Sequence, residues 1–159
     1  MWEIRELCRE AYDEDLSDTL EQLTPAVHVL GWLDSVLVAH ALWVTRWLQA
    51  GDAPLLKTAY VEAVATKASE RRRGFASQLL ARLARELGEY DLAALSPSDA
   101  AFYAKLGWEA WRGPLFIRKD AGLAATPDDS VMILRLARTP VGLNVTEPLS
   151  AEWREGELW

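Results

Sequence analysis

Apolar residues near the start of the chain recur at helical spacing, with charged side chains between them. The residues on this apolar face are Ile4, Leu7, Cys8, Ala11 and Tyr12. An acidic loop follows, and a second short helix is predicted over residues 19–23, where Pro25 ends it. Two short helices therefore precede the first strand.

The next part of the chain changes to strand-like runs. Residues 26–33 and 36–48 are apolar, β-branched and rich in tryptophan, and the Asp34-Ser35 pair between them predicts a β-hairpin. A third strand is expected over residues 56–67. Residues 75–87 return to helical spacing, and a strand is expected at 91–95, which together predict a βαβ crossover in a mixed sheet.

The last third of the chain is less regular. A helix is predicted over residues 98–106, with a cap in the Ser98-Asp99 region. Residues 108–118 and 131–138 are expected to form a final strand pair around the loop 119–130. Beyond Pro140 no periodicity is visible, but Trp153 and Trp159 predict that the tail docks.

Length and composition predict one domain over residues 1–159. Half of the residues are hydrophobic and 26% are charged, as in ordinary globular proteins. The net charge of −7 disfavours nucleic acid as a partner, because phosphates would be repelled. One cysteine and two histidines make neither an internal disulfide nor a Cys/His zinc cluster, so no metal is expected.

No segment resembles a signal peptide or a membrane span. The longest strongly apolar stretch, residues 35–45, is far shorter than the ~20 residues that cross a bilayer. We therefore expect a cytoplasmic protein with no membrane partner.

The segment between the third strand and the next helix carries the clearest chemistry. The strand ending at Thr66 leads into a basic loop, and the loop leads into a helix at Phe75. Backbone N–H groups and the helix dipole would converge there on an anion, such as a pyrophosphate. Three successive arginines strengthen this interpretation in an acidic protein, although a solvated basic turn is the alternative.

The spacing Arg71-x-x-Gly74-x-Ala76 resembles the acetyl-CoA loop of the GNAT superfamily of N-acetyltransferases, and residues 101–108 resemble its later helix with a tyrosine and a glycine-aromatic pair. The resemblance implies a GNAT (acyl-CoA N-acyltransferase) α/β fold with a mixed central β-sheet flanked by helices. It also implies acetyl-CoA as cosubstrate, with pantetheine along the preceding strand. The implied cofactor-binding residues are Val64, Thr66, Arg71, Arg72, Arg73, Gly74, Phe75, Ala76 and Ser77.

Further segments resemble one subfamily, the aminoglycoside 2′-N-acetyltransferases. They are residues 60–65, 94–96, 107–108, 111–114, 126–129 and 152–159, so the similarity runs from about Ile4 to the last residue. The chain departs from that subfamily at its start, where the usual strand before the first helix is missing, and at Gly74, where several relatives carry larger residues.

The resemblance implies roles for Glu62, Tyr103 and Val64. Glu62 lies in an apolar strand, where an unpaired carboxylate is costly unless it faces a cleft, and it corresponds to the base that acts on the acceptor amine. Tyr103 corresponds to the acid that protonates the CoA thiolate, and the Val64 N–H to the group that polarises the thioester carbonyl. The alternatives are an exposed strand glutamate and a packed aromatic ring.

Scattered acidic groups are expected to bind a cationic acceptor. By resemblance these substrate-binding residues are Asp15, Asp18, Glu62, Ser96, Asp129, Glu157 and Trp159, the last through its α-carboxylate. Cys8 lies on the first helix and is not expected to be a nucleophile. His28 and His40 are interpreted as structural, with a weaker role as a rival base.

The predicted function is acetyl transfer from acetyl-CoA to the 2′-amino group of an aminoglycoside by direct attack, as in antibiotic resistance, with the tail at 140–159 contributing to the acceptor site. An N-acetyltransferase for another polyamine or amino sugar is the nearest alternative. A non-catalytic aminoglycoside-binding protein is another, and a peptide N-terminal acetyltransferase is disfavoured because the tail would cover its open groove. The resemblance leaves a homodimer open.

Overall fold

A computed structural model describes residues 1–156 and 158–159, which fall into two units. The first unit comprises Met1–Val44 and Val61–Glu86, and the second comprises Thr45–Tyr60 and Leu87–Trp159. Strands β2 (Val36–Ala50) and β3 (Leu56–Thr66) each contribute one part to each unit. The single domain over 1–159 stays a prediction.

The first unit contains the expected hairpin. Strand β1 (Ala26–Leu33) pairs antiparallel with β2, from Ala26 opposite Val44 to Leu33 opposite Val36. Asp34 and Ser35 form the two-residue connection, and both have left-handed φ angles, 46° and 66°. This backbone matches the twist of the flanking strands, which is why such pairs favour hairpins.

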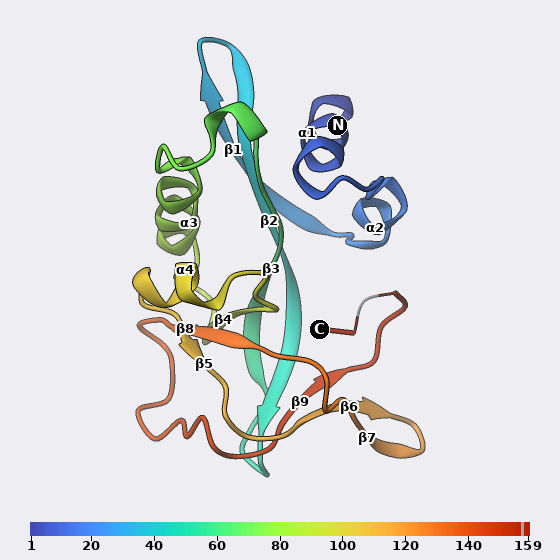
Figure 1. Cartoon of the computed structure of the whole chain (residues 1–159). Helices are drawn as coiled ribbons and strands as arrows, with labels where there is room; N and C mark the ends of the chain where they lie inside the picture. Colours follow the sequence, from blue (N-terminus) through green and yellow to red (C-terminus); the bar gives the residue numbers. More distant parts are fainter. Residues whose placement is uncertain (157) are drawn as a thin grey trace. The chain divides into compact units, whose positions relative to one another are not determined.

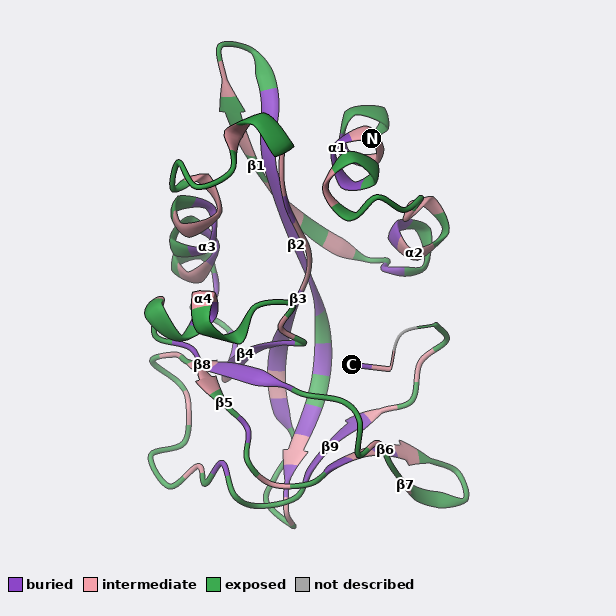
Figure 2. Cartoon of the chain, in the orientation of Figure 1, coloured by how far each residue is buried: buried purple, intermediate pink, exposed green. Residues whose placement is uncertain are grey.

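The helices of the first unit bury the apolar faces that the sequence pattern predicts. Helices α1 (Trp2–Tyr12) and α3 (Phe75–Glu86) lie on opposite sides of the β1–β2 hairpin (Figure 1). Figure 2 shows α3 buried toward the strands and exposed on its outer side. The short helix α2 (Ser17–Gln22) follows α1 and buries Leu20. No helix in the described residues is long and apolar enough to cross a membrane.

The second unit holds the mixed part of the sheet. Strand β4 (Leu92–Leu95) pairs parallel with β3 and antiparallel with β8 (Met132–Arg135), so the predicted mixed sheet is confirmed. The strand order is β5-β8-β4-β3-β2-β9-β6-β7, where β5 is Glu109–Ala110, β6 is Leu115–Lys119, β7 is Gly122–Ala125 and β9 is Leu149–Glu152.

Helix α4 (Ala100–Lys105) begins where the sequence predicts a cap. The carboxylate of Asp99 accepts a hydrogen bond from the Phe102 N–H at 3.1 Å. Such a cap satisfies one of the donors that a helix leaves open at its start.

The predicted final strand pair is wrong in its partners. Within residues 108–118, only the short β5 pairs with β8, whereas β6 pairs antiparallel with β7 and parallel with β9. After β5, the chain stops pairing with β8 between Trp111 and Pro114. In this stretch Gly113 lies against the backbone of Glu147, and Pro114 has no N–H to donate to a strand ladder. The predicted loop 119–130 therefore contains β7, and the tail supplies β9.

A buried arginine anchors the tail. Arg46 of β2 is only 2% exposed, and its guanidinium donates to the carbonyls of Glu152 and Leu158 at 2.7 and 2.6 Å. Its charged end also lies over the rings of Tyr60 and Trp159. Trp159 is 5% exposed, as the prediction of a docked tail requires, whereas Trp153 stays 55% exposed.

The close approach at Gly113 leads to a stability prediction. A Cβ at this position would lie 2.0 Å from the carbonyl oxygen of Glu147 and 2.7 Å from that of Thr146, so backbone must move. We expect Gly113→Ala to lower the free energy of unfolding by about 2–3 kcal/mol in urea titrations. The control is Gly142→Ala, because nothing lies within 4 Å of its added methyl group. Equal losses in both variants would contradict the prediction.

Candidate functional site

Strand β3 departs from extended geometry at one residue. Ala63 has a φ of 51°, in the left-handed region that residues other than glycine rarely adopt. The residues before it, from Thr58 to Val61, are buried, whereas Glu62, Ala63 and Val64 are half-buried. Backbone of this kind costs of order 1–3 kcal/mol and persists only where its surroundings hold it.

Two side chains from other elements hold the carbonyls at this position. The imidazole Nδ1 of His40, on β2, donates to the Ala63 carbonyl, and the hydroxyl of Tyr12, at the end of α1, donates to the Val64 carbonyl, both at 2.9 Å. Neither the contact of Tyr12 nor that of His40 with β3 is predicted from the sequence. A signal for His40 existed, because a polar residue in a long apolar run needs a buried partner.

His40 belongs to a buried chain of polar groups. Its Nε2 lies 2.9 Å from Nδ1 of His28, and the Sγ of Cys8 lies 3.9 Å from its Nδ1. Burial lowers the pKa of His40 to about 4, and burial together with the N-terminal charge also lowers the pKa of His28. Burial raises the pKa of Cys8 to about 11, so its thiol is a poor nucleophile.

The basic loop after β3 has the backbone of an anion site. It begins with the 3-10 helix η1 (Ala68–Glu70), and Arg72 and Gly74 then take left-handed φ angles of 62° and 85°. The Arg71 guanidinium donates to the Ala11 carbonyl at 2.8 Å, and Arg73 pairs with Glu70. The exposed Arg72 completes a positive rim on this loop.

Helix α3 starts directly after this loop. Its first backbone hydrogen bond runs from the Gln78 N–H to the Gly74 carbonyl at 3.0 Å. The N–H groups of Phe75, Ala76 and Ser77 therefore have no intrahelical acceptor and point from the helix start. Together with the arginines, they are a donor set that suits a diphosphate.

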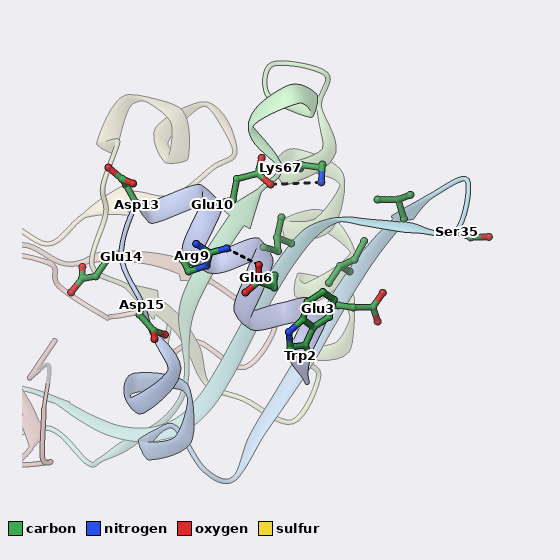
Figure 3. A pocket seen from close by; sticks show the side chains of 13 residues that line it. Trp2, Glu3, Glu6, Arg9, Glu10, Asp13, Glu14, Asp15, Ser35 and Lys67 are labelled. Carbon is green, nitrogen blue, oxygen red and sulfur yellow. Dashed lines mark hydrogen bonds and ion pairs between the residues drawn. The ribbon is translucent and has the colours of Figure 1, made fainter.

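An acidic surface pocket of about 850 Å³ lies elsewhere on the first unit. Figure 3 shows its carboxylates on α1 and on the loop that follows, with Glu6 paired to Arg9 and Glu10 to Lys67. Asp15 lines this pocket, and its carboxylate accepts hydrogen bonds from the side chain of Ser17 and from the Ser17 N–H, which lower the pKa of the carboxyl. Asp18, on α2, is exposed and stands outside the lining.

The remaining predicted site residues lie in the second unit, apart from Glu157, which is outside the described residues. Tyr103, on α4, is 5% exposed and packs edge-on against Phe102 and Trp108. Burial raises its pKa to about 12, so the hydroxyl keeps its proton near neutrality. Tyr103 is therefore observed as a packed aromatic ring, the alternative that the sequence offered for it.

Two of the residues predicted to bind the acceptor substrate, Asp129 and Trp159, contact the same residue, Thr126. The Asp129 N–H donates to the Thr126 carbonyl at 3.2 Å, and the Trp159 indole donates to the Thr126 hydroxyl at 2.8 Å. Asp129 and Ser96 are exposed, whereas Trp159 is buried. The described part of the second unit thus brings Asp129 and Trp159 together.

Comparison with known proteins identifies the family of the chain. The protein-family model described as "Acetyltransferase (GNAT) domain" matches residues 3–111 of the chain. The chain belongs to the GNAT acetyltransferase family. This match covers α1, β3, the basic loop and α4, so the GNAT domain includes both predicted motifs.

Three known proteins show how far the similarity of this GNAT domain extends. The aminoglycoside 2′-N-acetyltransferase of Mycolicibacterium fortuitum is 34% identical over 165 residues, covering 98% of this chain and 83% of that protein. A GNAT family N-acetyltransferase from Escherichia coli, solved in complex with CoA, shares the fold with a TM-score of 0.67 and 19% identity over 96% of this chain and 83% of that chain.

Eis1 from Mycobacterium abscessus matches 66% of this chain with a TM-score of 0.60 and 19% identity. The chain spans only 28% of the length of Eis1.

The buried histidine predicts how stability depends on pH. Its pKa is about 4 in the folded protein and 6.5 ordinarily, so between these values the unfolded chain binds more protons and stability rises with pH. About 3 kcal/mol present above pH 6.5 should be lost as the pH falls to 4. Urea titrations across this range should show a flatter profile for His40→Asn. A difference between the two proteins that does not vary with pH would contradict this.

Proposed function

We propose that this GNAT domain transfers the acetyl group of acetyl-CoA to the 2′-amino group of an aminoglycoside. The observation that carries the proposal is the course of β3 in the first unit. The strand places Glu62 and the Val64 N–H on either side of the left-handed Ala63 and then enters the Arg71–Ser77 loop. A carboxylate, a backbone donor and an anion site thus follow one another on a single segment.

The loop is proposed to bind the diphosphate of CoA. The N–H groups of residues 72–77 and the guanidiniums of Arg71 and Arg72 would face the phosphate oxygens, and Val64 and Thr66 would face the pantetheine. Acetyl-CoA supplies the acetyl group as a thioester. Family membership and the fit of this donor set both support the assignment.

The chain's own groups would then manage protons and charge. As the amine nitrogen bonds to the thioester carbon, Glu62 takes its proton and the Val64 N–H stabilises the negative charge on the carbonyl oxygen. When the C–S bond breaks, the hydroxyl of Tyr103 gives its proton to sulfur. The buried thiol of Cys8 supports direct attack rather than an acetylated cysteine.

The acceptor is proposed to be held by carboxylates and polar groups. Asp15, in the acidic pocket, and Asp129, beside Trp159, are acidic positions that suit ammonium groups. Asp18, Ser96 and Glu157 stay predictions of this kind, as do a cytoplasmic location and a homodimer. The choice of the 2′-amine rests on the aminoglycoside 2′-N-acetyltransferase that is 34% identical.

Removing either proton-transfer group should slow the chemical step. We expect Glu62→Gln and Tyr103→Phe each to lower kcat by about 10²–10⁴-fold, the usual contribution of a positioned acid or base. Steady-state assays with saturating acetyl-CoA check this, and circular dichroism shows whether each variant is folded. An unchanged kcat in both folded variants would reject the assigned roles.

The reaction itself is tested by following CoA release with a thiol reagent. The acceptors are kanamycin B, which has a 2′-amine, and kanamycin A, which has a hydroxyl there. Release with kanamycin B alone supports both the reaction and its position. Release with both would move the reaction to another amine, and release with neither would remove the aminoglycoside assignment.

A further inference from the structure

The hydrogen bonds at Ala63 define the protonation of the histidine pair. A carbonyl oxygen only accepts, so the Nδ1 of His40 must carry a proton in its bond to Ala63. A neutral His40 then has a bare Nε2, which accepts from the Nδ1–H of His28 at 2.9 Å. The resulting chain runs from His28 through His40 to the backbone of β3.

Because of this direction of donation, the histidine pair cannot act as a proton relay into β3. The proton on His40 Nδ1 faces a backbone carbonyl, which does not take it up, so the pair passes no proton into β3. His40 is also fully buried, and the low pKa keeps its imidazole neutral at the pH where the enzyme would work. The pair therefore suits holding a backbone group better than acting as a base.

The backbone group it holds lies next to the proposed reacting atoms. The Ala63 carbonyl carbon and the Val64 nitrogen share one peptide plane, so fixing the carbonyl oxygen also fixes the direction of the Val64 N–H. Tyr12 fixes the following carbonyl, that of Val64, from a different element. The peptide that follows the left-handed residue is thus held by a side chain on β2, and the next one by a side chain on α1.

We propose that His40, oriented by His28, is a positioning residue that aims the Val64 N–H at the thioester carbonyl oxygen. This proposal rests on the proposed acetyl transfer for its function, and on the hydrogen bonds of the first unit for its geometry. His40 contacts no reacting atom and acts only through the Ala63–Val64 peptide.

Kinetics of matched variants test the functional part. His40→Leu removes the donor while filling the space, whereas His40→Asn keeps an amide donor at the position of Nδ1. We expect His40→Leu to lower kcat about 10- to 100-fold with KM changed less than about threefold. The reason is that the hydrogen bond from the Val64 N–H to the carbonyl oxygen strengthens only in the transition state. His40→Asn should recover most of the loss. Leu83→Ala, a core variant on α3, controls for lost stability.

Amide spectra test the geometric part without any activity. In ¹⁵N-labelled protein, His40→Leu and Tyr12→Phe should both shift the Val64 amide resonance and speed its hydrogen exchange, whereas His40→Asn and Leu83→Ala should not. Long-range ¹H–¹⁵N spectra of the wild type should show the proton of His40 on Nδ1.

The outcomes of the two tests are distinguishable. An unmoved Val64 resonance in His40→Leu overturns the proposal, whether or not the wild type is active. A moved resonance with wild-type kcat overturns the positioning role and leaves acetyl transfer standing. A wild type that acetylates no amine removes the proposed function, while a moved resonance still assigns to His40 the control of the Val64 peptide.

Discussion

The hydrogen bond from His40 to the Ala63 carbonyl is the interaction on which the proposed chemistry depends. A strand commits its N–H and C=O groups to neighbouring strands, so a group that is to serve a ligand must leave that ladder. The left-handed Ala63 provides the departure, and it carries a cost that the backbone alone would not sustain. The buried His40 on β2 and the exposed Tyr12 on α1 offset that cost by donating to the carbonyls of Ala63 and Val64.

A second constraint concerns the distribution of charge. The chain carries a net charge of −7, yet its three successive arginines stand at the start of α3, where helix dipole and open N–H groups add to their field. The carboxylates of the first unit gather instead on α1 and the loop after it. The first unit therefore offers one surface suited to an anionic ligand and another suited to a cationic one, as the proposed transfer of an acetyl group from acetyl-CoA to a cationic amine requires.

The second unit relies on a different buried polar group. An arginine without hydrogen bonds would be costly in a core, but Arg46 donates to two carbonyls of the tail and lies over the rings of Tyr60 and Trp159. This explains how a tail without hydrophobic periodicity is ordered, since its backbone is bound by a side chain as well as by the short ladder of β9. The indole of Trp159 donates a hydrogen bond to the hydroxyl of Thr126, whose carbonyl accepts from the Asp129 N–H.

The sequence by itself determined the elements whose signals are local: the apolar faces of α1 and α3, the Asp34-Ser35 hairpin, the cap at Asp99 and the GNAT spacing around Arg71 and Gly74. Each depends on residues a few positions apart, so periodicity and turn chemistry suffice to predict it. Only the tertiary structure decided the partners of β6, the strand in the tail, the buried place of Tyr103 and the bonds from His40 and Tyr12 to β3. The hydrogen bonds from His40 and Tyr12 to β3, for example, join residues 23 and 52 positions apart. No local pattern specifies which side-chain donor meets which carbonyl, because that pairing is set by packing across the whole of each unit.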